Sequence, residues 1–414
     1  MDDSILQRVS EQFGTPTYVY FTSQIERRIE ELRSAFGHRV ALSYAVKSNP
    51  NVGLLEWLLR RVDYLDVSSI GELRLAREAG WEPSLISFTG PGKREFELRE
   101  AIQCGVGELV VESVREAVLA DNIAEAEGRK QNIIVRLSPD RVPKGFGDHM
   151  AGRPVAFGID VEDIDQELPR ILALRHLRLI GFHIFSGTQC LKADAIGDNY
   201  DIFAEIFTNT CQQYDIAPRK LIFGAGMGVP YHSGDEPLDL GAVAERAHAS
   251  LDGLARQARF AATEFVWELG RYLVAEAGFF LTRVVSIKSS RGARIGVCDG
   301  GMNNHLAASG HFGMVVHRPY VMHRVGGGTE IETVDLVGPL CTSIDRLGRG
   351  LKLAKLQEGD LIAVHNSGAY GITASPIHFI SHPPPKEILV VEDRLIDVSR
   401  CWMGQRQDCS HEKG

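Results

Sequence analysis

Short apolar runs alternate with amphipathic helical segments from about residue 20 to residue 268, and this alternation limits the fold more than any other feature of the chain. The runs are rich in β-branched and aromatic residues and end at Gly, Pro, Asn or Ser, which is typical of buried strands. Predicted strands are 42–46, 64–67, 85–89, 108–112, 133–137, 180–185, 220–223 and 265–268. Predicted helices are 23–36, 52–61, 70–79, 95–103, 113–127, 198–211 and 240–258. Eight such parallel units predict an α/β fold, a (β/α)8 barrel.

Beyond residue 273 the pattern changes to short β runs separated by Gly, Pro and Asp. We therefore expect two domains, with residues 22–264 forming the barrel and residues 1–21 and 265–414 forming a β-rich domain. We predict strands in this second domain at 280–286, 295–298, 334–337, 361–364 and 387–391, and expect a frayed tail after residue 402.

Composition excludes several classes of protein. The net charge of −9, without a block of basic residues, argues against a nucleic-acid partner. No apolar run is long enough to span a membrane, and the opening Met1-Asp2-Asp3-Ser4 does not resemble a signal peptide, so we expect a cytoplasmic protein. The seven cysteines form no C-x-x-C pair, and we expect neither a disulfide framework nor a metal site.

Lys47 follows the first predicted strand and precedes the breaker Asn49-Pro50. The carboxyl ends of barrel strands are where such folds carry their chemistry, although a strand-end lysine can also simply extend to water. If Lys47 binds pyridoxal phosphate, the chain must also provide a phosphate site and an anion for the pyridine nitrogen. The Gly-rich turn 223–228 follows a strand and suits the phosphate, while Glu268 ends the last strand and suits the nitrogen.

Three further residues complete this hypothesis, and each has a structural alternative. Arg271 can bind phosphate or form a local ion pair with Glu268. His183 can stack on the cofactor ring, with Ser186 adding a hydroxyl for the phosphate, or it can be a hydrogen-bonded core histidine. Cys341 can be a proton donor or a small buried apolar residue.

Taken together, these motifs resemble the fold-type III pyridoxal-phosphate decarboxylases, the group of diaminopimelate, ornithine and arginine decarboxylases. The resemblance covers nearly the whole chain, in the order and rough spacing of the family. The matching segments are Tyr44-Ala-Val-Lys47-Ser-Asn-Pro, Asp66-Val-Ser-Ser-Ile-Gly-Glu72, Phe182-His183-Ile-Phe-Ser186-Gly, Gly224-Ala225-Gly226, Glu268-Leu-Gly270-Arg271, Cys341 and Gly368-Ala-Tyr370-Gly.

The resemblance implies the fold of alanine racemase and ornithine decarboxylase, with pyridoxal 5'-phosphate as cofactor. It implies Lys47 as the Schiff-base lysine, His183 on the ring and Glu268 on the pyridine nitrogen. The remaining residues implied for the cofactor site, most of them around the phosphate, are Asp66, Ser186, Gly224, Ala225, Gly226, Gly270, Arg271 and Tyr370. It also implies a homodimer with shared active sites, to which the β-rich domain contributes Cys341 from the partner subunit as the proton donor.

Substrate identity is where the chain departs from the best-known members of the group. The residue after this cysteine is a glutamate in diaminopimelate decarboxylases and an aspartate in ornithine decarboxylases, whereas here it is Thr342, which cannot pair with an ammonium as a carboxylate does. Diaminopimelate decarboxylases also carry an Arg-Pro pair shortly after a Gly-Met-Asn segment, whereas here residues 301–303 are followed by no arginine until Arg318. We expect Thr342 and Asp345 to contact the substrate.

These departures look closest to a subgroup from natural-product pathways. Its members decarboxylate a glutamyl group on an acyl-carrier protein, siderophore intermediates, or substrates of exosortase-associated clusters. The segments that suggest it are Gly90-Pro-Gly-Lys93, Lys144-Gly, Phe157-Gly-Ile-Asp160, 183–189, Met302-Asn, Ala307-Ala-Ser309 and Cys341-Thr. We therefore expect decarboxylation of an amino acid or amino-acid conjugate that is free or carrier-bound.

Three alternatives remain at this point. They are a diaminopimelate decarboxylase, an amino-acid racemase, which would place a tyrosine near Cys341, and a non-catalytic regulator, which would lack Lys47 or Cys341. The Gly- and Pro-rich connection 138–159 is either a loop that faces the substrate or a solvated crossover.

Overall fold

The computed structural model describes residues 3–311 and 318–400. Their contacts divide them into two compact units. The barrel unit comprises Glu26–Pro230 and Glu236–Leu273, and the β-rich unit comprises the other described residues.

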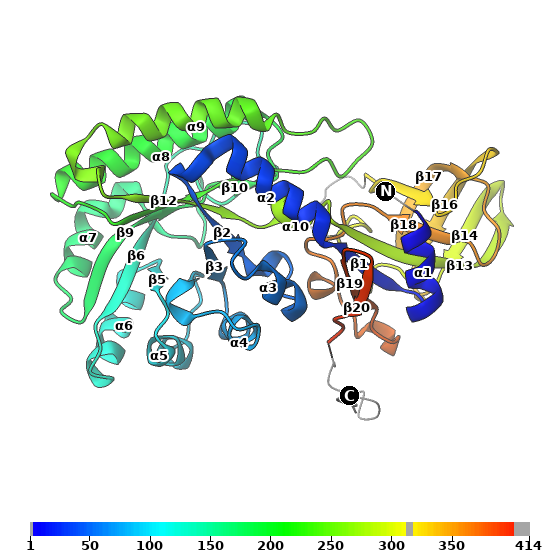
Figure 1. Cartoon of the computed structure of the whole chain (residues 1–414), viewed down its shortest axis with the longest axis horizontal. Helices are drawn as coiled ribbons and strands as arrows, with labels where there is room; N and C mark the ends of the chain where they lie inside the picture. Colours follow the sequence, from blue (N-terminus) through cyan, green and yellow to red (C-terminus); the bar gives the residue numbers. More distant parts are fainter. Residues whose placement is uncertain (1–2, 312–317, 401–414) are drawn as a thin grey trace. The chain divides into compact units, whose positions relative to one another are not determined.

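Eight parallel strands close the barrel, as the sequence predicts (Figure 1). Their order is β2, β3, β4, β5, β6, β9, β11 and β12, and β12 pairs again with β2. The strands are β2 Ala41–Ala45, β3 Tyr64–Val67, β4 Ile86–Phe88, β5 Glu108–Val111, β6 Gln131–Ser138, β9 Leu177–Ile184, β11 Lys220–Gly224 and β12 Glu264–Leu269.

Helices follow the strands on the outside of the barrel, and α8 packs along α9 (Figure 1). They are α2 Thr22–Phe36, α3 Val52–Leu58, α4 Ile70–Glu78, α5 Glu95–Cys104, α6 Val114–Ala126, α7 Ile164–Leu172, α8 Ala193–Gln213, α9 Leu240–Ala255 and α10 Arg271–Val274. Several begin at a side-chain cap: Ser69, Ser113 and Asp239 each accept a hydrogen bond from the amide three residues on. Helix α7 was not predicted. Its buried residues Ile164, Leu168 and Ile171 have helical spacing, but Pro169 lies among them and proline normally ends a helix.

The barrel interior contains an apolar layer made by one inward-facing residue from each of several strands. These residues are Val110, Ile134, Ile180, Ile222 and Val266. Because side chains along a strand alternate between two faces, residues two positions before or after this layer also face inward. The layer therefore separates an amino-end set of inward side chains from a carboxyl-end set.

Strand β9 breaks this alternation with a bulge. Ile133 of β6 pairs with Leu179 but Ile134 pairs with Gly181, so Ile180 is the extra residue on β9. Ile180 can then face the interior together with His183, three positions later. Gly181 is required here, because a Cβ at this position would overlap the carbonyl oxygen of Lys220.

The connection 138–159 is held to the barrel at several points. Its strand β7 Asp148–His149 pairs with β10 Gly187–Thr188, and its last residue begins β8 Ile159–Asp160, which pairs with β6. The Met150 amide donates to the Ser186 carbonyl at 2.7 Å. The middle of the segment is therefore attached to the residues that follow β9, while many of its other residues are exposed to solvent. Both interpretations of this connection stay predictions.

The β-rich unit is built on a sheet in the order β17, β16, β14, β13, β1, β19 and β20, with β18 on β13 and β15 on β18. Helix α1 Asp3–Phe13 packs Leu6 and Val9 into the apolar core that β1 and β13 share. The strands are β1 Thr17–Phe21, β13 Gly278–Ser290, β14 Ala293–Cys298, β15 Met322–Arg324, β16 Ile331–Val337, β17 Arg346–Ala354, β18 Leu361–Val364, β19 Lys386–Val391 and β20 Arg394–Asp397.

The predicted strands of this unit are present, but the sequence analysis missed α1, β15, β17 and β20. Strand β17 was not predicted because its two arginines, one lysine and two glycines hide the alternation of its apolar residues. The expected frayed tail lies outside the described residues. No helix within 3–311 and 318–400 is long and apolar enough to cross a membrane.

The expected domain range ends at residue 264, whereas the barrel unit continues to Leu273. The reason is β12, which hydrogen-bonds to both β2 and β11 and so belongs with the barrel.

We predict that Gly181→Ala destabilises the barrel by about 2–3 kcal/mol, because the new methyl group must displace the backbone of β11. The measurement is the free energy of unfolding in urea. Gly253→Ala is the matched control: this glycine lies in α9 with open space around its Cβ position, and the substitution should stabilise the protein by about 0.5–1 kcal/mol. Equal effects of the two changes would contradict the bulge as the cause.

Candidate active site

Lys47 lies in a 3₁₀ turn, Val46–Ser48, immediately beyond β2. The expected strand thus ends earlier than residue 46, but the lysine is still held by a short rigid element at the carboxyl end of the barrel. Its side chain is half-buried, and Nζ lies 5.3 Å from the centroid of the Phe185 ring.

His183 and Glu268 form a buried hydrogen-bonded pair at the same end of the barrel. The distance from His183 Nε2 to Glu268 Oε2 is 3.0 Å, and both side chains are almost fully buried. Burial lowers the pKa of His183, although the bond to Glu268 acts in the opposite direction. Burial would raise the pKa of Glu268, but the bond from His183 and the charges of Lys47 and Arg136 hold it below its ordinary value.

Asp66 is the second buried carboxyl group near Lys47. Asp66 lies near the carboxyl end of β3 and is 2% exposed. The Thr89 hydroxyl donates a hydrogen bond to its Oδ1. Oδ2 has no hydrogen-bond partner among the described residues. Burial, followed by the charge of Glu268, raises the pKa of Asp66 well above its usual range, whereas the pKa of Glu268 is lowered, so the surroundings favour the negative charge on Glu268.

Ser186 and the turn Gly224-Ala225-Gly226 follow two adjacent strands, β9 and β11. Ser186 is fully buried, and in the described structure its Oγ has no hydrogen-bond partner. Gly226 has a φ of +69°, which favours glycine, and a Cβ at Gly224 would overlap the Phe185 ring. The glycines therefore let the Phe185 and Phe146 rings pack directly against the turn, on the strand adjacent to the one that Ser186 follows.

Phe146, from the connection 138–159, covers one side of this turn. It is 7% exposed, and a Cβ at Gly226 would lie 2.6 Å from its Cε1 atom. The Gly147 amide also donates to the Thr188 carbonyl at 2.9 Å. Phe146 was not predicted as a site residue, because its position against Gly226 depends on the pairing of β7 with β10.

Gly270 and Arg271 follow β12. A Cβ at Gly270 would lie 3.1 Å from the Cβ of Ser48, so this glycine lets β12 end close to the turn that carries Lys47. Arg271 begins α10 and is half-buried.

The other predicted site residues belong to the β-rich unit. Cys341 is exposed and Thr342 is half-buried. Asp345 is buried, and its two oxygens accept the amides of Met302 at 2.7 Å and Leu340 at 2.8 Å. Asp345 therefore holds the loop on which Cys341 and Thr342 lie. Tyr370 has a φ of +53° and is half-buried.

A buried ion pair that the sequence analysis missed lies behind His183. Arg136 Nη1 is 3.2 Å from Glu112 Oε2, and the Arg136 guanidinium lies 4.8 Å from the centroid of the Phe157 ring. Glu112 also accepts the amides of Gly90 and Gly158, each at 2.9 Å. An arginine inside an apolar strand was the available signal, since a charge there must face a polar partner.

Comparison with known proteins identifies the family. Residues 22–275 match the pyridoxal-binding domain of the pyridoxal-dependent decarboxylases. This chain belongs to that family, and it is a pyridoxal-phosphate-dependent amino acid decarboxylase.

Three relatives show how far the similarity extends. The chain is 36% identical to L-glutamyl-[BtrI acyl-carrier protein] decarboxylase of Niallia circulans, over 94% of this chain and 92% of that protein. It is 30% identical to diaminopimelate decarboxylase of Aquifex aeolicus, over 93% and 89% of the two chains. The solved structure of Helicobacter pylori diaminopimelate decarboxylase complexed with L-lysine is 28% identical, with a TM-score of 0.84 and coverage of 95% and 96%.

The described residues fit this cofactor. A phosphate group needs hydroxyl and amide donors, and the buried Ser186 Oγ, which has no partner among the described residues, follows the strand adjacent to the one that ends in the 224–226 turn. A pyridine nitrogen needs an anion, and Glu268 remains ionised although it is buried.

We predict that Asp66→Asn stabilises the cofactor-free protein at pH 7–8 and has little effect near pH 4. The pKa of Asp66 is raised on folding, so the wild-type protein loses stability as the pH rises above the unfolded-state value of about 4, by at most about 1.4 kcal/mol per pH unit. Asparagine does not titrate and avoids this loss. Urea unfolding of both proteins from pH 4.5 to 8 measures the difference, and a difference that shrinks with rising pH would contradict the assignment of a neutral Asp66.

Proposed function

We propose that this chain removes the α-carboxylate of an amino acid that is attached to a carrier protein or to another conjugate. The observation that carries the proposal is Thr342, which stands where recognition of a free distal ammonium would need a carboxylate. The lack of an arginine soon after residues 301–303, where the first one is Arg318, supports it, because a conjugated substrate has no distal carboxylate to bind. The relative that acts on a carrier-bound glutamyl group, at 36% identity, supports it as well.

Each site residue has a proposed role. Lys47 would hold the cofactor covalently. Glu268 would keep a proton on the pyridine nitrogen, and His183, which hydrogen-bonds Glu268, would contact the ring. Pyridoxal phosphate, when bound, supplies the electron sink that accepts the electron pair left by CO₂.

The phosphate and the proton are assigned to other residues. In this proposal the phosphate is surrounded by five elements of the site: Ser186, the amides of 224–226, Gly270, Arg271 and Tyr370. Cys341, contributed by the second subunit of a homodimer, returns a proton to the α-carbon, and its exposed position in the β-rich unit is compatible with that role.

Diaminopimelate decarboxylation is the second candidate. It is favoured by the roughly 30% identity to diaminopimelate decarboxylases over nearly the whole chain. The two candidates differ in the distal end of the substrate, and therefore an assay can separate them.

We expect Lys47→Ala to lose both the visible absorbance band of the bound cofactor and the release of CO₂, because no other residue is assigned to the covalent link. Lys130→Ala, which changes an exposed lysine far along the chain from the site, is the control and should retain both. Full turnover by the Lys47 variant would refute the assignment.

We expect kcat/KM for carrier-bound glutamate to exceed that for free meso-diaminopimelate by about 10- to 100-fold. A missing charge-assisted hydrogen bond costs about 1.5–3 kcal/mol, and each 1.4 kcal/mol is a factor of ten. Release of CO₂ from free glutamate, carrier-bound glutamate and diaminopimelate, measured side by side, tests this. Equal values for diaminopimelate and the carrier-bound substrate would favour the second candidate.

A further inference from the structure

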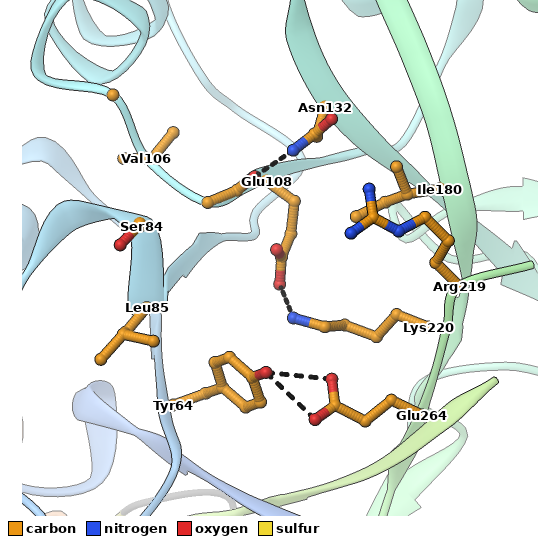
Figure 2. Close-up of a pocket in the computed structure, with 12 residues that line it drawn as sticks. Tyr64, Ser84, Leu85, Val106, Glu108, Asn132, Ile180, Arg219, Lys220 and Glu264 are labelled. Carbon is orange, nitrogen blue, oxygen red and sulfur yellow. Dashed lines mark hydrogen bonds and ion pairs between the residues drawn. The ribbon is translucent and has the colours of Figure 1, made fainter. Parts of the chain in front are cut away.

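A polar hollow of about 360 Å³ lies at the amino-terminal end of the barrel strands, the opposite end from Lys47 (Figure 2). Most of its polar lining comes from residues at or next to the start of strands. These are Tyr64, Glu108, Asn132, Arg219, Lys220 and Glu264.

The alternation of side chains explains why charged groups face inward here. Glu108, Lys220 and Glu264 each precede a residue of the apolar interior layer by two positions, so they form the next layer toward the amino-terminal end. Barrels commonly fill such layers with branched apolar side chains. This barrel places acidic and basic side chains there instead.

Two of the charges are paired with each other inside the hollow. Lys220 Nζ lies 2.9 Å from Glu108 Oε1 and 3.8 Å from the centroid of the Tyr64 ring. Both charged side chains are buried, and Ser87 also donates a hydrogen bond to Glu108. Lys220 and Glu108 therefore already have hydrogen-bond and ion-pair partners at the base of the hollow.

Two groups at the rim retain binding capacity. Figure 2 shows the Arg219 side chain at the hollow, and within the described residues its guanidinium has no hydrogen-bond or ion-pair partner. In the described parts of the chain, the Glu264 carboxylate accepts a side-chain hydrogen bond only from the Tyr64 hydroxyl, at 3.1 and 3.0 Å, although it has about four lone-pair sites. The Glu264 amide donates to the Arg219 carbonyl at 2.9 Å, so the two residues are neighbours on adjacent strands.

We propose that this hollow is a second, non-catalytic binding site for a small zwitterionic α-amino acid. Arg219 binds the carboxylate through two parallel N–H donors, and Glu264 binds the ammonium group. The volume lies at the lower end of the range for small-molecule sites, about 300–1,000 Å³, which suits a compact ligand. The proposal does not depend on the substrate assigned above.

Ligands of a single charge fit less well. An anion at Arg219 would also face Glu264 and Glu108, and a cation at Glu264 would also face Arg219 and Lys220. A zwitterionic ligand avoids both problems, because its carboxylate can pair with Arg219 while its ammonium group pairs with Glu264. A second hollow of about 490 Å³, which shares Tyr64, Leu85 and Glu264, offers room for the ligand's side chain.

The experiment is calorimetric titration of the full-length holoenzyme with glycine, alanine, glutamate and lysine, and separately with inorganic phosphate and ethylamine. The variants are Arg219→Gln and Glu264→Gln, both at exposed positions. Arg178→Gln is the matched control, because Arg178 is an exposed arginine on the neighbouring strand β9 that does not line the hollow. Binding at the catalytic site contributes equally in all of these proteins, so differences between variants report the hollow.

We expect at least one amino acid to lose tenfold or more in affinity in both the Arg219 and the Glu264 variants, with no change in the Arg178 control. The proposal is overturned if no amino acid shows this loss. It is also overturned if phosphate binds as tightly as the amino acids and Glu264→Gln leaves binding unchanged, since the hollow would then be an anion site.

Discussion

The two-residue alternation of side chains along the barrel strands is the constraint on which the rest of the barrel unit depends. Along β12, Glu264, Val266 and Glu268 all face inward, at the amino end, the middle and the carboxyl end. Glu108 and Val110 of β5, followed by the buried Glu112 just beyond the strand, repeat this order. A single apolar layer therefore separates two polar layers, so the polar side chains described at one end of the barrel do not contact those at the other.

The sequence was sufficient to predict those features that depend on local signals. An apolar run that ends at a breaker locates a strand without knowledge of its neighbours, so all eight barrel strands were predicted within a few residues. The same locality placed Lys47 and Glu268 at strand ends. The family resemblance then added Asp66 and Gly270, whose positions alone carried no chemical signal.

Features that depend on pairing between distant segments were not predictable in this way. His183 faces the interior only because Ile180 is bulged out, and regular alternation would put Ile180 and His183 on opposite faces. Gly181 marks the bulge, but a lone glycine in an apolar run does not say which strand lies against it. The same limit applies to Phe146, whose place beside Gly226 follows from the pairing of β7 with β10.

The partition of charge between Asp66 and Glu268 follows from their different neighbours. Two buried carboxylates near one lysine cannot both ionise cheaply, so their environments must favour one of them. Glu268 accepts a hydrogen bond from His183 and feels Lys47 and Arg136, whereas Asp66 has one hydroxyl donor and an oxygen without a partner in the described structure. The negative charge therefore stays on Glu268. A cationic ring nitrogen would be held at Glu268 and not at Asp66, because only Glu268 offers a full charge at neutral pH. Arg136 contributes to this partition although it is paired with Glu112, because its positive charge still lowers the pKa of Glu268.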